Sequence, residues 1–118
     1  LNMILGKIFS IFAYLMGVPM GEATTVGGLM GTKLVLNEMV AYVDLTSLTQ
    51  PLSAKSYLIA AVALCSFGNF GSIAIQLGGI GELAPNQRKN LARLGVRALI
   101  CGTLTCYMSA AIVGILVN

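Results

Sequence analysis

The sequence predicts an all-α membrane protein made of a re-entrant helical hairpin, one broken transmembrane helix and a C-terminal transmembrane helix. Hydrophobic residues make up 57% of the chain and charged residues only 9%, whereas a soluble domain carries about 25% charged residues. So few charges cannot cover a water-facing surface. The uncharged stretches 57–81 and 98–117 are also each long enough for a bilayer-spanning helix, which needs about 20 residues.

The first two elements are predicted to be incomplete spans. Residues 1–21 are interpreted as the end of a transmembrane or interfacial helix, which Pro19 and the glycines beside it break. Residues 22–48 are predicted to form the re-entrant hairpin, because each half contains a charge and too few apolar residues to cross a bilayer. The turn is expected near residues 30–36, which places Glu38 at or near the start of the second half-helix.

The broken transmembrane helix is predicted over residues 53–81. Ser53 follows a polar loop and suits the start of a helix. Within the apolar run, residues 67–72 are Phe-Gly-Asn-Phe-Gly-Ser, and each glycine weakens a helix by about 1 kcal/mol relative to alanine. We therefore expect local unwinding at these residues. Residues 86–117 are predicted to form a basic interfacial start followed by the last transmembrane helix.

Four of the seven basic residues gather in one short stretch before the last predicted span. Lysine and arginine near the ends of spans collect on the cytoplasmic side, so residues 88–97 are expected in the cytoplasm and the C-terminus outside. No basic face with interleaved aromatic residues extends beyond this stretch, which argues against a nucleic-acid partner. The basic residues are Arg88, Lys89, Arg93 and Arg97.

The residue types present argue against a metal site and against an enzyme. The chain has three cysteines and no histidine, and no two cysteines form a Cys-x-x-Cys pair, so no structural zinc site is expected. Cys65, Cys101 and Cys106 lie in apolar runs and are expected to be buried free thiols. A phosphate-binding glycine loop, a nucleophile with its base and a pair of carboxylates for acid–base chemistry are all missing from the sequence. We expect no enzymatic activity and no cofactor.

Glu38 is the first candidate for a binding residue. At the start of a half-helix, free backbone amides and the positive end of the helix dipole stabilise an ionised carboxylate. A carboxylate can accept two hydrogen bonds from a vicinal diol, which is how acidic residues commonly recognise ribose. The alternatives are a capping role or a pair with Lys33.

Asn69, Ser72 and Phe67 are the candidates in the interrupted helix. Asn69 and Ser72 lie three residues apart, so they share a face if the segment is helical and can converge if it is unwound. The alternative for both is hydrogen bonding between helices, which is common for these residue types in membranes. Phe67 is suited to stacking on a ligand ring, with ordinary packing as its alternative.

Three segments resemble, in this order, parts of the C-terminal half of the concentrative nucleoside transporters, which are sodium- or proton-coupled symporters. They are residues 31–42 (Gly-Thr-Lys-Leu-Val-Leu-Asn-Glu-Met-Val-Ala-Tyr), residues 63–75 and residues 83–88. The chain departs from the family pattern at Met39, where the family usually has an aromatic residue. It also departs at Ser66, where the family tends to have glycine.

The resemblance implies a role for each candidate residue. Glu38 matches the hairpin glutamate that holds the ribose of the nucleoside. Asn69 and Ser72 match polar groups of the broken helix that also meet the ribose, and Phe67 matches an aromatic residue beside the bound nucleoside. In the family the nucleobase and the coupling ion, Na⁺ or H⁺, are bound mainly by the N-terminal half.

The resemblance therefore implies the ribose-binding half of a nucleoside symporter that is inactive alone and needs its N-terminal half as a partner. It also implies a homotrimer in the plasma (inner) membrane with an elevator-like moving domain. The chain begins with Leu1 rather than Met and its opening lacks a signal-peptide pattern, so we expect a C-terminal piece of a longer protein. The alternative function is a small structural multi-span membrane subunit with no ligand.

Overall fold

The structure is a computed structural model that describes residues 2–117, without the side chain of Asn2. All regular elements in this range are helices, which confirms the all-α class. In chain order they are α1 (Asn2–Leu15), α2 (Met20–Val35), α3 (Glu38–Thr46), α4 (Ala54–Ala63), α5 (Phe70–Leu83), the short 3₁₀ helix η1 (Pro85–Gln87) and α6 (Arg88–Leu116). The expectations about the two chain ends concern Leu1 and Asn118, which lie outside the described residues.

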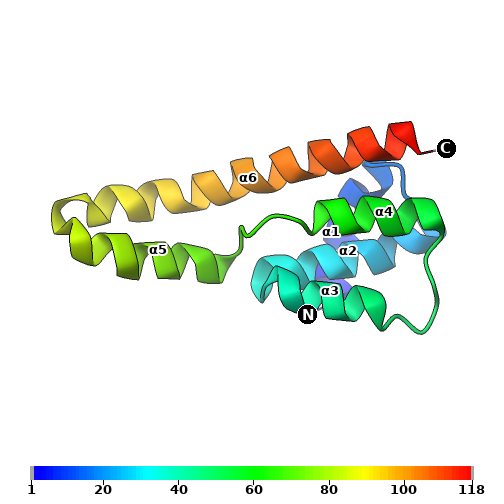
Figure 1. Cartoon of the computed structure of the whole chain (residues 1–118), viewed down its shortest axis with the longest axis horizontal. Helices are drawn as coiled ribbons and strands as arrows, with labels where there is room; N and C mark the ends of the chain where they lie inside the picture. The colour runs from blue at the N-terminus through cyan, green and yellow to red at the C-terminus, as the bar shows by residue number, and fades with distance from the viewer. Residues whose placement is uncertain (1, 118) are drawn as a thin grey trace.

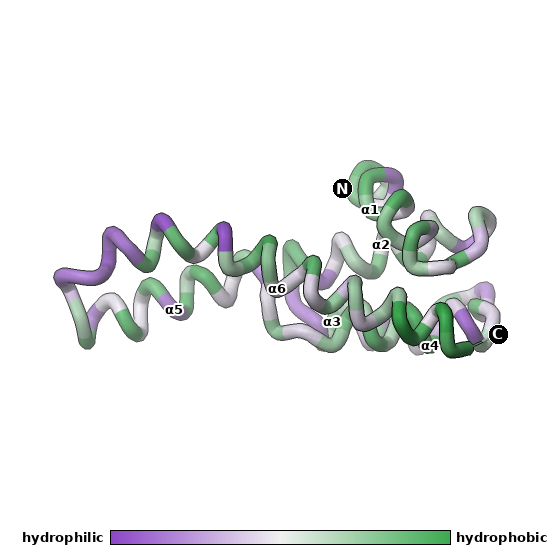
Figure 2. The backbone as a smooth tube through the Cα atoms, turned by 90° about the horizontal axis from the view of Figure 1, so that it is seen from above, coloured by the Kyte–Doolittle hydropathy of each residue, from purple (hydrophilic) through white to green (hydrophobic). Residues whose placement is uncertain are grey.

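The helices form a bundle with an arm. Helices α1 to α4 gather at one end, and α5 with the first half of α6 projects from them, so that the molecule measures 49 × 26 × 21 Å (Figure 1). Helix α6 contacts α5 along the arm and α4 in the bundle. Figure 2 shows the hydrophilic residues gathered toward the free end of this arm, with hydrophobic residues along the rest of α6.

Helices α1 and α2 meet at a sharp corner. Their axes differ in direction by 118°, Gly17 has a φ of +101°, and Pro19 is the N-cap of α2. A Cβ added to Gly27 would lie 2.5 Å from the carbonyl oxygen of Gly6, so the two backbones touch. The corner is also covered by α6, because a Cβ on Gly114 would lie 2.2 Å from the carbonyl oxygen of Met16.

Helices α2 and α3 pack against each other as a helical hairpin with a two-residue turn. Helix α2 continues through Val35, so the turn falls at the C-terminal edge of the expected residues 30–36. Gly31 is helical and lies against α1, where a Cβ would lie 2.7 Å from the Cβ of Leu5. Asn37 caps α3, its Oδ1 accepting from the backbone N–H of Val40 at 2.9 Å. Glu38 is the first residue of α3, as the sequence predicts.

The interrupted helix consists of α4 and α5, separated by residues 64–69. The break therefore begins and ends a few residues earlier than the expected 67–72, and Gly71 and Ser72 lie in the first turn of α5. The reason is the Asn69 side chain, which caps α5 and starts the helix at the next residue. At its other end, α4 begins after Ser53, the predicted helix start.

By length and composition, one helix of the described residues could cross a membrane, the continuous segment Pro85–Leu116. Only 28% of its most apolar window is buried inside the chain, so it is not the core helix of this bundle. The bent pair Met3–Leu15 and Met20–Val35 passes the same test when its two helices are taken together.

The expectation of three buried thiols is wrong for two of them within this chain. Cys65 and Cys101 are exposed and Cys106 is half-buried, and all three are free. Cys65 lies in the break between α4 and α5, where the backbone leaves the bundle, and Cys101 lies on an exposed face of α6. Cys106 faces α4, and its Sγ donates to the carbonyl oxygen of Val62 at 3.1 Å.

Candidate functional site

Two side chains of the hairpin reach the end of α4 and the break that follows it. Lys33 Nζ donates to Ser66 Oγ at 2.5 Å, and the Tyr42 hydroxyl donates to the carbonyl oxygen of Ala61 at 2.7 Å. The Ala61 carbonyl is free for this contact because its ordinary helical partner, the N–H of Cys65, bonds to Val62 instead. The turn of the hairpin and the break in the second helix are therefore tied together.

Glu38 holds a carboxylate oxygen that the chain itself does not use. Its Oε2 is buried and has no hydrogen-bond partner among the described residues. Asn37 provides the side-chain cap of α3, and the Lys33 ammonium donates its hydrogen bond to Ser66. As the first residue of α3, Glu38 lies at the positive end of the helix dipole.

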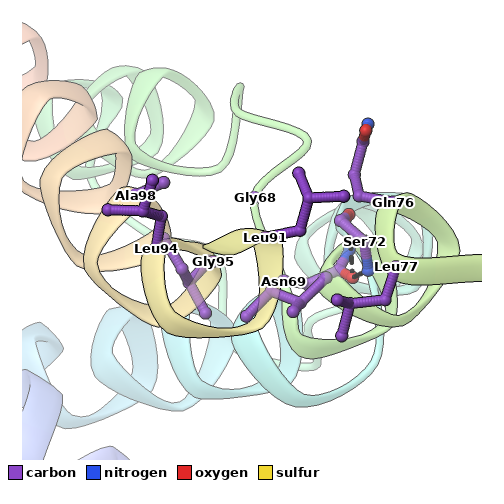
Figure 3. A pocket seen from close by; sticks show the side chains of 11 residues that line it. Gly68, Asn69, Ser72, Gln76, Leu77, Leu91, Leu94, Gly95 and Ala98 are labelled. Atoms are coloured by element: carbon purple, nitrogen blue, oxygen red, sulfur yellow. Dashed lines mark hydrogen bonds between the residues drawn. The ribbon is translucent and has the colours of Figure 1, made fainter. Parts of the chain in front are cut away.

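Asn69 and Ser72 converge at the start of α5 (Figure 3). Asn69 Oδ1 accepts from the backbone N–H of Ser72 at 2.8 Å, and it lies 3.1 Å from Ser72 Oγ. Ser72 Oγ also donates to the carbonyl oxygen of Phe67 at 2.6 Å. These bonds stay within the break and the first turn, so bonding between helices does not describe either residue in this chain. The Nδ2 amide of Asn69 donates no hydrogen bond to the residues that the structure describes.

A groove of about 330 Å³ runs between α5 and α6 beside these residues. Asn69, Ser72 and Gln76 supply its polar groups, and Figure 3 shows the end of the Gln76 side chain pointing away from the other two. The remaining lining consists of glycine and apolar residues: Gly68, Ile73, Leu77, Leu91, Leu94, Gly95, Ala98 and Leu99.

The structure brings the four predicted residues together only in part. Asn69 and Ser72 share hydrogen bonds and the groove, and Phe67 joins them through its backbone carbonyl while its ring is 79% exposed. Glu38 lies on the hairpin, outside the residues that line the groove. The hairpin that carries Glu38 is linked to the interrupted helix by two hydrogen bonds, one from Lys33 and one from Tyr42.

Sequence reasoning missed Lys33 and Tyr42 as connecting residues. Lys33 is 0% exposed, and a fully buried lysine is rare unless it is paired. The available signal was a lysine in a segment otherwise suited to a membrane, whose nearest partner along the sequence is Glu38 and not Ser66. Tyr42 gave no comparable signal, since tyrosine is common in apolar helices.

The chain is similar over nearly its whole length to known transporter sequences. Residues 1–114 match the family described as Na+ dependent nucleoside transporter C-terminus. The chain is 50% identical over 117 residues to the uncharacterized transporter YutK of Bacillus subtilis, covering 99% of this chain and 29% of that protein. It is 36% identical over 123 residues to the nucleoside permease NupC of Helicobacter pylori, covering 100% and 29%. It is 38% identical over 130 residues to human solute carrier family 28 member 3, covering 98% and 19%.

Solved structures show the same arrangement of helices. The chain matches CNTnw in an inward-facing substrate-bound state with a TM-score of 0.92 and 42% identity, covering 100% of this chain and 30% of that one. A variant of CNTnw in an intermediate state gives a TM-score of 0.90 at 43% identity, covering 97% and 29%. The chain thus spans less than a third of the length of the relatives it matches. These relatives are transporters and permeases, which confirms the expectation that the chain is not an enzyme.

Proposed function

This chain belongs to the family of concentrative, Na+ dependent nucleoside transporters, and we propose that it supplies the ribose-binding half of a cation-coupled nucleoside symporter. One observation carries the proposal most directly. Glu38 Oε2 is a buried carboxylate oxygen at a helix N-terminus that no described residue satisfies. Buried polar groups are normally hydrogen-bonded, and a vicinal diol is a ligand that would satisfy this one.

In this proposal each of the four residues has a separate task. Glu38 accepts hydrogen bonds from ribose hydroxyls, and the unused Nδ2 amide of Asn69 donates to a hydroxyl oxygen. Ser72 also binds the ribose. Through its hydrogen bonds with Asn69, it holds the first turn of α5 in place. Phe67, whose ring is exposed in the break, lies beside the nucleoside.

The rest of the symporter completes the site. Because the chain covers 29% of the H. pylori permease, we propose that the nucleobase and the coupling ion, Na⁺ or H⁺, are held by the N-terminal part. We further propose that α2 and α3 form a re-entrant hairpin, that α4 and α5 form a broken transmembrane helix, and that α6 is the last span. In this arrangement residues 88–97 face the cytoplasm, the C-terminus lies outside, and the whole protein is a homotrimer of the plasma (inner) membrane with elevator-like movement.

The test measures ribose-dependent binding by the full-length protein. Thermal stabilisation in detergent by uridine is compared with that by uracil, for wild type, Glu38→Gln and the matched control Glu82→Gln. Glu82 is an exposed carboxylate at the end of α5. A hydrogen bond to a charged group contributes about 1.5–3 kcal/mol, so Glu38→Gln should weaken uridine binding by about 10- to 100-fold, and the control should bind as wild type does.

Uridine stabilisation that Glu38→Gln leaves unchanged would remove Glu38 from the site. Equal stabilisation by uridine and uracil would mean that the ribose is not recognised. A wild-type protein that responds to no nucleoside would instead favour the structural subunit without a ligand.

A further inference from the structure

Lys33 is the one charged side chain of the described residues that is completely buried, with 0% of its surface exposed. It lies in the last turn of α2, and its ammonium donates to Ser66 Oγ at 2.5 Å. An ammonium has three donors and is costly to remove from water unless it is paired. A buried ammonium is therefore retained only where neighbouring groups stabilise it.

The place where the Lys33 ammonium binds is the negative end of a half-helix. Ser66 lies two residues beyond Leu64, the C-cap of α4, and the end of a helix carries a partial negative charge on its free carbonyls. Three of these carbonyls are already bonded by neutral groups. Tyr42 donates to Ala61, and Cys106 donates to Val62 and Ala63. The Lys33 ammonium binds Ser66, which follows this helix end in the break.

The same contact joins the two elements that carry the proposed ribose groups. Glu38 follows Lys33 across the turn of the hairpin, and Asn69 follows Ser66 at the end of the break. The break is also confined from another side, because a Cβ on Gly68 would lie 3.2 Å from Leu99 Cδ1 of α6. The bond between Lys33 and Ser66 is therefore the direct side-chain link from the hairpin to the break itself, beside the Tyr42 bond to α4.

We propose that Lys33 is a positioning residue, which anchors the break between α4 and α5 on the hairpin and so holds Asn69 and Ser72 in place relative to Glu38. Its ammonium neutralises the negative helix end as a bound monovalent cation would, but it cannot dissociate. This inference rests on the proposed function for its consequence in ligand binding. The anchor itself does not depend on what the ligand is.

A positioning role predicts a different result from a purely structural one. Burying an ammonium costs free energy, and Lys33→Met removes that cost together with the single hydrogen bond to Ser66, so it should keep the thermal midpoint of the protein or raise it. The variant should nevertheless no longer hold the residues of the break in their positions relative to the hairpin. Loss of binding without loss of stability is the signature of positioning.

The experiment uses the full-length protein in proteoliposomes and compares wild type, Lys33→Met, Ser66→Ala and the control Lys7→Met, whose side chain is exposed on α1. Lys33→Met should raise the KM for uridine at least about tenfold, equivalent to about 1.4 kcal/mol, at an unchanged thermal midpoint. Ser66→Ala keeps the charge but removes its acceptor, and should raise KM severalfold. Lys7→Met should match wild type.

A second measurement needs no nucleoside. In a background where Cys65 is the only cysteine, with Cys106→Ser, Cys101→Ala and every cysteine elsewhere in the full-length protein replaced, the rate of Cys65 alkylation reports the freedom of the break. Lys33→Met should raise this rate severalfold, and Lys7→Met should not change it. Cys65 directly precedes Ser66, so it senses the anchor at close range.

The outcomes separate the anchor from the transport function. Unchanged uridine KM in Lys33→Met overturns the proposal even if alkylation rises, because the anchor would then not position the site. Should Lys33→Met fail to accumulate in the membrane, an unchanged KM in Ser66→Ala overturns it equally. If wild type takes up no uridine, the proposed function fails, and the anchor is then judged by Cys65 alone, where equal alkylation rates overturn it.

Discussion

The Tyr42 hydroxyl donates a 2.7 Å hydrogen bond to the carbonyl oxygen of Ala61 and so ties the second arm of the hairpin to the last turn of α4. The Ala61 carbonyl lacks its ordinary helical partner at the break, because the N–H of Cys65 bonds to Val62 instead. The Tyr42 hydroxyl replaces that partner. Half-helices end in carbonyls without helical partners. In this chain a neighbouring element supplies the missing donor.

Tyr42→Phe should lower the thermal midpoint of the full-length protein. The substitution removes only the hydroxyl and leaves the Ala61 carbonyl unpaired, which costs about 1–3 kcal/mol for a buried group. Tyr14→Phe is the matched control, since Tyr14 is 53% exposed on α1. Equal midpoints for the two variants would show that the bond with Ala61 adds nothing to stability.

Gly27→Ala should separate α1 from α2, because its Cβ would lie 2.5 Å from the carbonyl oxygen of Gly6 and 2.6 Å from the amide of Ser10. The neighbouring Gly28→Ala meets nothing within 4 Å, and it gains helix propensity of about 1 kcal/mol. Thermal unfolding in detergent should therefore show a loss for the first variant and no loss for the second. Similar midpoints for both would contradict the close approach of the two helices.

Substitutions of Asn69 should separate capping from ligand binding. Asn69→Asp keeps an oxygen that accepts from the N–H of Ser72, so the cap of α5 and the thermal midpoint should be preserved. It lacks the Nδ2 donor, so the affinity for uridine should fall about tenfold, equivalent to about 1.4 kcal/mol.

Asn69→Ala serves as the comparison for the cap. It loses the capping oxygen as well as the donor and should also be less stable by about 1 kcal/mol. Both quantities can be read from thermal unfolding with and without uridine. If Asn69→Asp binds uridine as wild type does, the Nδ2 amide of Asn69 has no part in the site.

Glu22→Ala should loosen the start of α4. The Glu22 carboxylate accepts from the backbone N–H of Ser53 at 3.1 Å and from its hydroxyl at 2.9 Å, and the loss of hydrogen bonds to a charged group costs about 1.5–3 kcal/mol. Glu82→Ala breaks the exposed ion pair with Arg88 and should have little effect on the thermal midpoint. An equal loss in both variants would argue that Glu22 acts only through surface charge.

The sequence alone predicted the local features of this fold well. Breaks, caps and helix starts depend on residues close in sequence: Pro19 ends the first apolar run, Ser53 starts α4, and Glu38 opens α3. The class of the chain followed from its shortage of charge, and the family from three short segments. Each of these signals lies within a few residues of the feature that it predicts.

What the sequence did not reveal depends on contacts between distant residues. The turn of the hairpin falls after Val35, and Gly31 lies inside α2 against Leu5, which is far away in sequence. Lys33 meets Ser66 only once the hairpin and the break are packed together. Cys101 is exposed because α6 has an uncovered face within this chain, and hydropathy alone does not distinguish a covered face from an uncovered one.

The contact between Gly114 and the carbonyl of Met16 has a consequence for the order in which the protein is made. The corner between α1 and α2 is synthesised before α3, α4 and α5, and the part of α6 that covers it follows only after all of them. At about 5–20 residues per second, the ribosome needs about 5–20 s to deliver that cover. During this time the corner must be shielded by lipid, by the translocation machinery or by a neighbouring polypeptide, so α6 covers the corner only after a delay.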